Sequence, residues 1–174
     1  MTATEDRQII RDGDKEYTQV ADHNYHDKLL YENEGWQIGD LDKAADFSSP
    51  TGVKRITVTK FQDCEVAMNC YAPGAHDEMH CHPGGDHAFL IWRGKLHITG
   101  VDTGEDFIAT PGQVVHIAGG YYYKLHNPGP EPAIYANFQP TKPNGPKRHT
   151  ILWTESARGK RDAEERDARG EAPR

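Results

Sequence analysis

The chain has 174 residues and a mass of 19.5 kDa, a size that suits one domain with extensions rather than two domains. Its net charge of −7 and pI near 5.8 disfavour a nucleic-acid partner, and a mean hydropathy of −0.83 argues against a membrane span. Three cysteines without an apolar export signal predict free thiols and a cytoplasmic protein.

Residues 1–50 predict a polar N-terminal arm. Apolar residues there are isolated anchors, such as Leu30 and Leu41, in a polar background. We expect the arm to hold one or two short elements and to end at Pro50. The compact domain is then predicted over residues 51–154.

Most of this domain alternates between short runs rich in β-branched and aromatic residues and turn signals that contain glycine or proline. Strands are predicted over residues 53–61, 65–71, 87–92, 95–101, 106–109, 114–117, 121–126 and 133–138, with a possible last strand at 150–153. Short strands at this spacing predict an all-β fold, an antiparallel sandwich or barrel. We expect Phe89 and Ile91 to face the interior and Leu90 and Trp92 to face outward, against another subunit.

Histidines gather in one short stretch of the predicted domain. His80, Cys81 and His82 alternate on a strand, so the two imidazoles share one face. A turn at Pro83 then brings His87 back beside them at the start of the next strand. Three imidazoles from one hairpin predict a site for a divalent metal ion. His76, His116 and His126 are expected at the loop entrance or on the outer surface.

The C-terminal segment, residues 155–174, carries six basic and six acidic residues and alanine as its one aliphatic type. It cannot bury enough apolar surface to offset the entropy of ordering. A disordered tail or a solvated helix is therefore predicted, with disorder preferred.

Two glycine-bounded motifs carry a resemblance to the cupin superfamily. The first has the spacing of the family's Gly-x5-His-x-His pattern, with histidine where glutamate is usual. The second has alanine for the usual proline and tyrosine for the usual histidine. The matching residues are Gly74, His80, His82, His87 and Gly94 in the first motif and Gly112, Gly120, Tyr123 and Asn127 in the second.

The resemblance implies a cupin-type antiparallel β-barrel, or jelly roll, flanked by the polar arm and the charged tail. It implies that His80, His82 and His87 bind one divalent transition metal ion: iron first, with zinc, manganese or nickel as alternatives. Small cupins are commonly homodimers, so a homodimer is expected, with a small organic molecule as substrate. Neither a nucleic acid nor a membrane is expected as a partner.

Two further residues are candidates for catalysis. Tyr123 could bind ferric iron as a phenolate, but an ordinary phenol pKa of about 10 favours a neutral hydroxyl that positions substrate or water. Glu78, beside the histidine pair, could serve as a general base, although such a residue is more often a solvated charge.

The resulting hypothesis is a metal-dependent enzyme that acts on a small organic substrate, with an iron dioxygenase preferred. The first alternative is a non-redox cyclase, isomerase or lyase, because polyketide-cyclase-like cupins also have histidine at the glutamate position. The second is a non-catalytic cupin that binds or senses a ligand.

Overall fold

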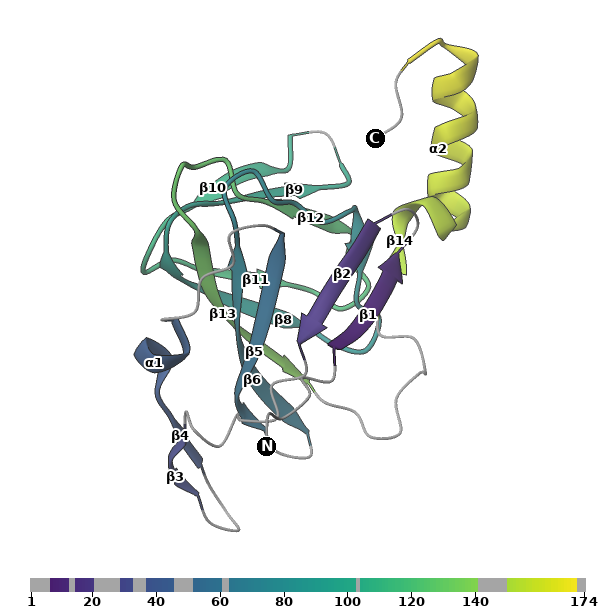
Figure 1. Ribbon diagram of the computed structural model, residues 1–174. Coiled ribbons are helices and arrows are strands. Elements are labelled where there is room, and N and C mark those ends of the chain that lie inside the picture. Colours follow the sequence, from purple (N-terminus) through teal and green to yellow (C-terminus); the bar gives the residue numbers. More distant parts are fainter. Residues whose placement is uncertain are drawn as a thin grey trace.

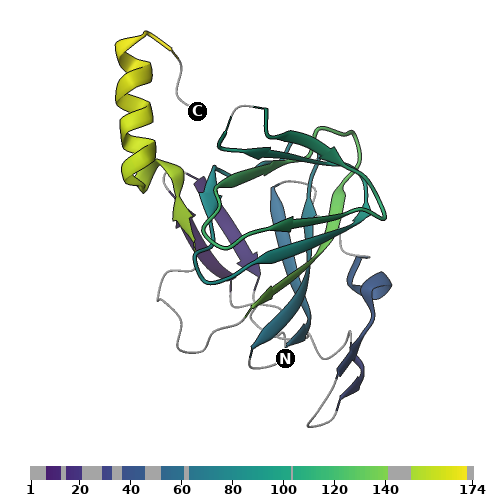
Figure 2. The ribbon, with the colours of Figure 1, turned by 180° about the vertical axis from the view of Figure 1, so that it is seen from behind.

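The computed structural model describes residues 7–12, 15–20, 29–32, 37–45, 52–60, 63–102, 104–140 and 150–171. Its body is a pair of five-stranded antiparallel sheets that face each other as a jelly roll (Figure 1). The first sheet has the strand order β11-β8-β13-β6-β5, and the second has the order β10-β9-β12-β7-β14. Figure 2 shows both sheets from behind, with the C-terminal helix α2 projecting away from them.

The first sheet is built from β5 (Val53–Lys60), β6 (Cys64–Tyr71), β8 (His87–Arg93), β11 (Val114–Ile117) and β13 (Ala133–Pro140). The second is built from β7 (His80–Cys81), β9 (Leu96–Gly100), β10 (Asp106–Ala109), β12 (Tyr123–His126) and β14 (Ile151–Leu152). Before them come the hairpin of β1 (Arg7–Asp12) and β2 (Lys15–Val20), the hairpin of β3 (Leu29–Glu32) and β4 (Gln37–Gly39), and helix α1 (Leu41–Ala45). The predicted strands at 106–109 and 114–117 have the observed bounds, and the other predicted strands differ from the observed ones by a few residues at their ends.

Alternating side chains divide each strand between an inner and an outer face. On β8, His87, Phe89 and Ile91 are buried while the residues between them are half-exposed. The main core lies between the two sheets and holds Tyr71, Phe89, Ile91, Leu96, Ala109, Ile117, Tyr123, Leu125, Ala133 and Tyr135. The predicted inward orientation of Phe89 and Ile91 is confirmed, since each is 1% exposed.

The outer face of the first sheet is covered by helix α1 of the same chain. Ala44 and Ala45 are buried there in a second core, which includes Met68 of β6. Leu90 and Trp92 pack against this second core. Both stay half-buried, and their predicted contact with another subunit stays a prediction.

Within the C-terminal segment the structure has helix α2 over Ala157–Ala168. Its N-cap is Ser156, whose Oγ accepts a hydrogen bond from the backbone N–H of Gly159 at 2.8 Å. Arg158 lies over the Trp153 ring, 5.4 Å from its centroid, and bridges to Asp102 at 2.6 Å. Neither this helix nor any other helix in the described ranges has the length and apolarity required to span a bilayer.

One glycine of the first motif, Gly94, is needed at a tight corner. Gly94 has a φ of +69°, and a Cβ there would collide with the Pro132 carbonyl oxygen and lie 2.9 Å from Cα of Ala133. Only glycine meets both conditions. This corner joins β8 to β9 and so connects the first sheet, which carries His87, to the second.

Candidate functional site

The β7–β8 connection brings together the three histidines predicted as metal ligands. The ring centroids of His80 and His82 are 4.9 Å apart, and those of His82 and His87 are 4.3 Å apart. His80 and His87 are 8% and 7% exposed, and His82 is half-buried. The cluster therefore lies at the inner side of the barrel, where the sequence pattern placed it.

Tyr123 reaches the same cluster from β12. It is the register partner of His80, and its ring centroid lies 4.6 Å from that of His80 and 6.2 Å from that of His82. Burial raises the phenol pKa well above its ordinary value, and the nearby Tyr135 and Asp77 raise it further. The protein environment by itself therefore favours the neutral phenol, and both roles of Tyr123 stay predictions.

The orientation of His80 is set by the backbone. Nδ1 lies 2.7 Å from the carbonyl oxygen of Glu78, and a carbonyl can only accept, so Nδ1 carries the proton. The lone pair then belongs to Nε2. Glu78 itself is half-buried, and this carbonyl contact gives it a place in the site in addition to the predicted role of its carboxylate.

His87 is held neutral. Burial lowers its pKa to about 4, and the charges of His80 and Arg55 act in the same direction. Its Nδ1 is buried and, among the described residues, has no hydrogen-bond partner. A buried imidazole that is neutral and has an unpartnered nitrogen has the properties of a metal ligand.

The donor set suits a borderline divalent transition ion, but the rings do not converge on one point. Two imidazoles on one ion have centroids roughly 4.5–5 Å apart, given metal–nitrogen bonds of about 2.0–2.1 Å. The His80–His82 separation of 4.9 Å meets this value, and the His82–His87 separation of 4.3 Å is slightly shorter. His82 and His87, however, are stacked with 14° between their planes, so their in-plane lone pairs run parallel. In the described part of the chain no three His, Cys, Asp or Glu side chains have the arrangement of a metal site. Turning the half-buried His82 ring, whose Nδ1 lies 3.4 Å from Thr150 Oγ1, is the change that a shared ion requires.

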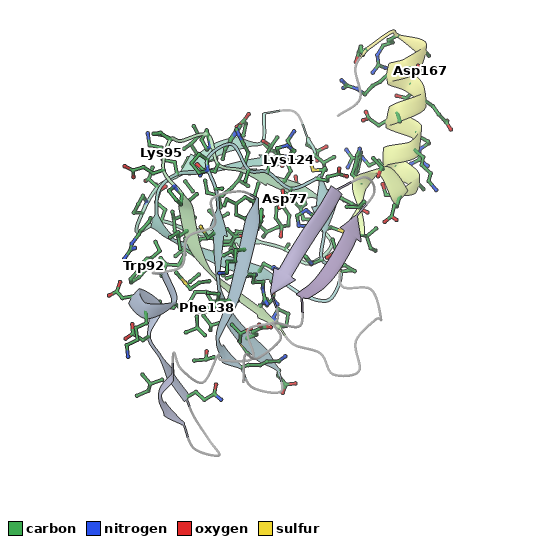
Figure 3. All side chains as sticks on the ribbon, viewed as in Figure 1. Asp77, Trp92, Lys95, Lys124, Phe138 and Asp167 are labelled. Atoms are coloured by element: carbon green, nitrogen blue, oxygen red, sulfur yellow. The ribbon has the colours of Figure 1, made fainter. Side chains whose placement is uncertain are left out.

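A hydrogen-bonded group that the sequence did not reveal lies beneath the histidines. Asp77, labelled in Figure 3, lies between the two sheets. Its carboxylate accepts from Tyr71 Oη at 2.8 Å and from the Leu125 backbone N–H at 2.5 Å, and lies 3.9 Å from His80 Nδ1. Burial raises the Asp77 pKa, although His80 and the two donors oppose the shift. Asp77 follows a proline-glycine turn, a position where a single sequence offers no signal of burial.

The inner face of the first sheet carries a second polar group near His87. Arg55 of β5 forms an ion pair with the 5%-exposed Glu65 of β6 (2.9 Å), and Thr57 donates to the same carboxylate oxygen at 2.7 Å. Burial raises the Glu65 pKa, but the charge of Arg55 and the Thr57 hydrogen bond outweigh it, so the net shift is downward. Glu65 therefore stays ionised and balances the Arg55 charge.

Four further described histidines, His76, His97, His116 and His126, lie outside the barrel interior, and this position was predicted for His76, His116 and His126. His76, His126 and His97 follow one another across the outer face of the second sheet, with ring centroids 6.4 and 6.0 Å apart. His97 contacts Asp106 on the neighbouring strand. His116 is exposed on β11 and lies 3.5 Å from Asp86.

Comparisons with known proteins agree on the fold. Residues 67–138 match the cupin domain family. An uncharacterised conserved protein with a double-stranded β-helix domain from Klebsiella pneumoniae aligns with a TM-score of 0.56 and 21% identity, covering 70% of this chain and 97% of that chain. A cupin superfamily protein from Desulfitobacterium hafniense gives a TM-score of 0.52 at 16% identity (66% and 96% covered). The polyketide cyclase RemF from Streptomyces resistomycificus gives 0.51 at 11% identity (62% and 82% covered). A search of curated proteins found no match.

Proposed function

Because residues 67–138 match the cupin domain family and the two sheets have the cupin fold, we propose that the protein is a metal-dependent enzyme acting on a small organic substrate. His80, His82 and His87 would hold one divalent transition metal ion. The bound ion would supply Lewis-acid chemistry and, if it is iron, oxidation by dioxygen.

One observation carries this proposal: three imidazoles cluster at the inner side of the barrel, and His87 is buried and neutral, with an Nδ1 that has no hydrogen-bond partner among the described residues. A neutral His87 needs no deprotonation before it binds a metal ion. His80 has its proton fixed on Nδ1 by the Glu78 carbonyl, which leaves Nε2 available. Three neutral ligands leave the positive charge of the ion intact, and this favours an anionic substrate.

Iron dioxygenase activity is the first form of the proposal. Tyr123 is a buried phenol beside His80, and its hydroxyl is suited to donate a hydrogen bond to a substrate oxygen rather than to ionise. Glu78 would assist by holding the His80 ring through its backbone carbonyl.

A non-redox cyclase, isomerase or lyase is the second form. It is favoured by the proximity of two groups that can hold a proton in the barrel interior, the Tyr123 phenol and the Asp77 carboxyl, whose pKa values are both raised by burial. The polyketide cyclase RemF has the same fold, although 11% identity carries no residue roles across. A binding or sensory protein is the third form.

Metal analysis of protein purified without chelator tests the proposal. We expect about one transition metal ion per chain in the wild type and a sharp loss in each of the variants His80→Ala, His82→Ala and His87→Ala. His87→Glu should retain metal, because a carboxylate is also a good ligand. His116→Ala, an exposed histidine on the neighbouring strand β11, is the matched control and should retain full metal content. Full occupancy in His87→Ala would remove His87 from the site.

Dioxygen uptake separates the forms of the proposal. Uptake that follows substrate consumption supports the dioxygenase, and turnover without uptake supports the non-redox enzyme. Tyr123→Phe should keep its metal and slow turnover. Loss of metal in this variant would instead make Tyr123 a ligand.

A further inference from the structure

We propose that the inner face of the first sheet, beside His87, binds a small hydroxycarboxylate through Arg55, Asn69 and Asn137. The proposal rests on the proposed function, since it names the substrate class of that same site. These three residues belong to β5, β6 and β13, and the sequence patterns did not single them out.

Unpartnered polar atoms mark this face. Among the described residues, four buried side-chain atoms have no hydrogen-bond partner: Arg55 Nη2, Asn69 Nδ2, His87 Nδ1 and Asn137 Oδ1. Nearly all buried polar atoms in folded proteins are partnered, so each exception requires a reason. All four belong to one sheet, which points to one shared reason.

Strand parity places the four residues on the same side of that sheet. Asn69, Asn137 and His87 each lie two residues from a member of the main core on their own strand, namely Tyr71, Tyr135 and Phe89. Arg55 is the register partner of Asn69, and Asn137 is the register partner of Phe89. Arg55 faces Asn69, and Asn137 is a diagonal neighbour of Asn69. Such pairs have Cβ atoms roughly 4.5–8 Å apart, so one small molecule can lie between these three side chains.

The charge and hydrogen-bonding capacity of these residues define the ligand. Arg55 Nη2 lies 2.9 Å from Glu65 Oε1, but its N–H bonds are not directed at that oxygen, so we count an ion pair with donors still open. Arg55 Nη2 and Asn69 Nδ2 are donors and match two carboxylate oxygens. Asn137 Nδ2 is used by Gln139, and its free Oδ1 accepts from a hydroxyl group.

The site is reachable from solvent. The Arg55 side chain is 24% exposed, so the group extends from solvent into the interior. Glu65 already balances Arg55, so a bound carboxylate adds a net negative charge, and each further carboxylate on this face would raise the electrostatic cost. The ligand that matches the open donors and the acceptor at the lowest charge has one carboxylate and an adjacent hydroxyl.

Three matched probes test the ligand class on the full chain: lactate, propionate, which lacks the hydroxyl, and 1,2-propanediol, which lacks the carboxylate. Binding is followed by NMR through the side-chain amide signals of Asn69 and Asn137. We expect saturable shifts with lactate, about tenfold weaker binding of propionate, and the weakest binding for the diol. Equal affinities for all three probes, or no saturable shift with lactate, would overturn the proposal and leave these atoms as hosts of ordered water.

Variants assign the contacts. Asn69→Leu and Asn137→Leu should each weaken lactate binding about tenfold while the protein stays folded. Arg55→Gln combined with Glu65→Gln removes the charge without orphaning either partner, and should abolish binding. Arg93→Gln, an exposed arginine at the end of β8, is the control and should leave affinity unchanged. Undiminished lactate binding in the Arg55/Glu65 double variant would exclude Arg55 as the carboxylate partner.

Metal titration of the same samples separates this proposal from the proposed function. Metal binding without lactate binding would overturn the ligand class and leave the metal site intact. Lactate binding without metal binding would overturn the metal site and leave the ligand class intact. The two outcomes are separable because Arg55, Asn69 and Asn137 are not members of the predicted metal-ligand set.

Discussion

Asn127 offers the sharpest test of how the barrel is held together. It is 0% exposed, and its side chain makes three hydrogen bonds. Nδ2 donates to the carbonyls of Tyr71 (2.9 Å) and Glu131 (2.8 Å), and Oδ1 accepts from the Gly129 N–H (2.9 Å). The side chain thus joins the end of β6 to the turn before β13.

Asn127→Leu keeps the volume and removes all three bonds. The buried bond to Tyr71 should account for about 1.5 kcal/mol, and the two half-buried bonds for about 0.5–1 kcal/mol each. The sum, about 3 kcal/mol, corresponds to a melting temperature lower by about 6–12 °C in a chain of this size. Urea unfolding and thermal melts measure it.

Asn69→Leu is the matched control, because Asn69 is also buried but its Nδ2 has no partner. Replacing an unsatisfied donor by an apolar group of similar shape should be neutral or stabilise by up to about 1 kcal/mol. The two substitutions are chemically identical and differ only in the bonds present. Equal destabilisation in both variants would refute the hydrogen-bond argument and indicate a packing effect.

Three further outcomes are expected. Gly94→Ala should destabilise the protein by about 3 kcal/mol or more, because it adds a backbone collision to a left-handed φ. Gly112→Ala, with φ +86° and open space around it, should cost only about 1 kcal/mol. Equal melting temperatures of the two variants would rule out an effect of the collision. Folding lowers the pKa of Glu65, so this carboxylate stabilises the folded protein above its unfolded pKa near 4.5, and the stabilisation is lost as pH falls. Urea titrations from pH 6 to 3 should show a smaller decrease in the free energy of unfolding for the Arg55→Gln/Glu65→Gln double variant than for the wild type. Deleting residues 161–174 should change the melting temperature by about 1 °C or less. Deleting residues 155–174 should lower it by several degrees, because the deletion removes Arg158 and uncovers Trp153. An equal effect of the two deletions would contradict a stabilising contact between Arg158 and Trp153.

The sequence predicted those parts of the fold that depend on local patterns. Alternation on β8 placed His87, Phe89 and Ile91 on one face, and the turn at Pro83 placed His87 beside His82. Gly94, a glycine of the first motif, lies at a left-handed corner. These features follow from strand parity and turn chemistry, which act over a few residues.

Features that depend on contacts between distant segments were not predicted. Leu90 and Trp92 pack against a second core that includes Ala44 and Ala45 of helix α1, some fifty residues earlier, and no local pattern identifies this core. The Arg55–Glu65 ion pair and the burial of Asp77 likewise depend on how strands are aligned. A single polar residue in a predicted strand is usually assigned to solvent, and in this barrel several of them point inward.

Buried polar residues of the barrel divide into two groups with opposite thermodynamic consequences. Asn127 and Asp77 use their hydrogen-bonding atoms within the chain, so they fix the geometry of turns and of His80. Asn69 and Asn137 leave atoms unpartnered on the inner sheet beside the equally unpartnered His87, which lowers stability in the free protein. Folding alone would favour leucine at the two asparagine positions, and the ligand proposed above would offset this cost by completing their hydrogen bonds.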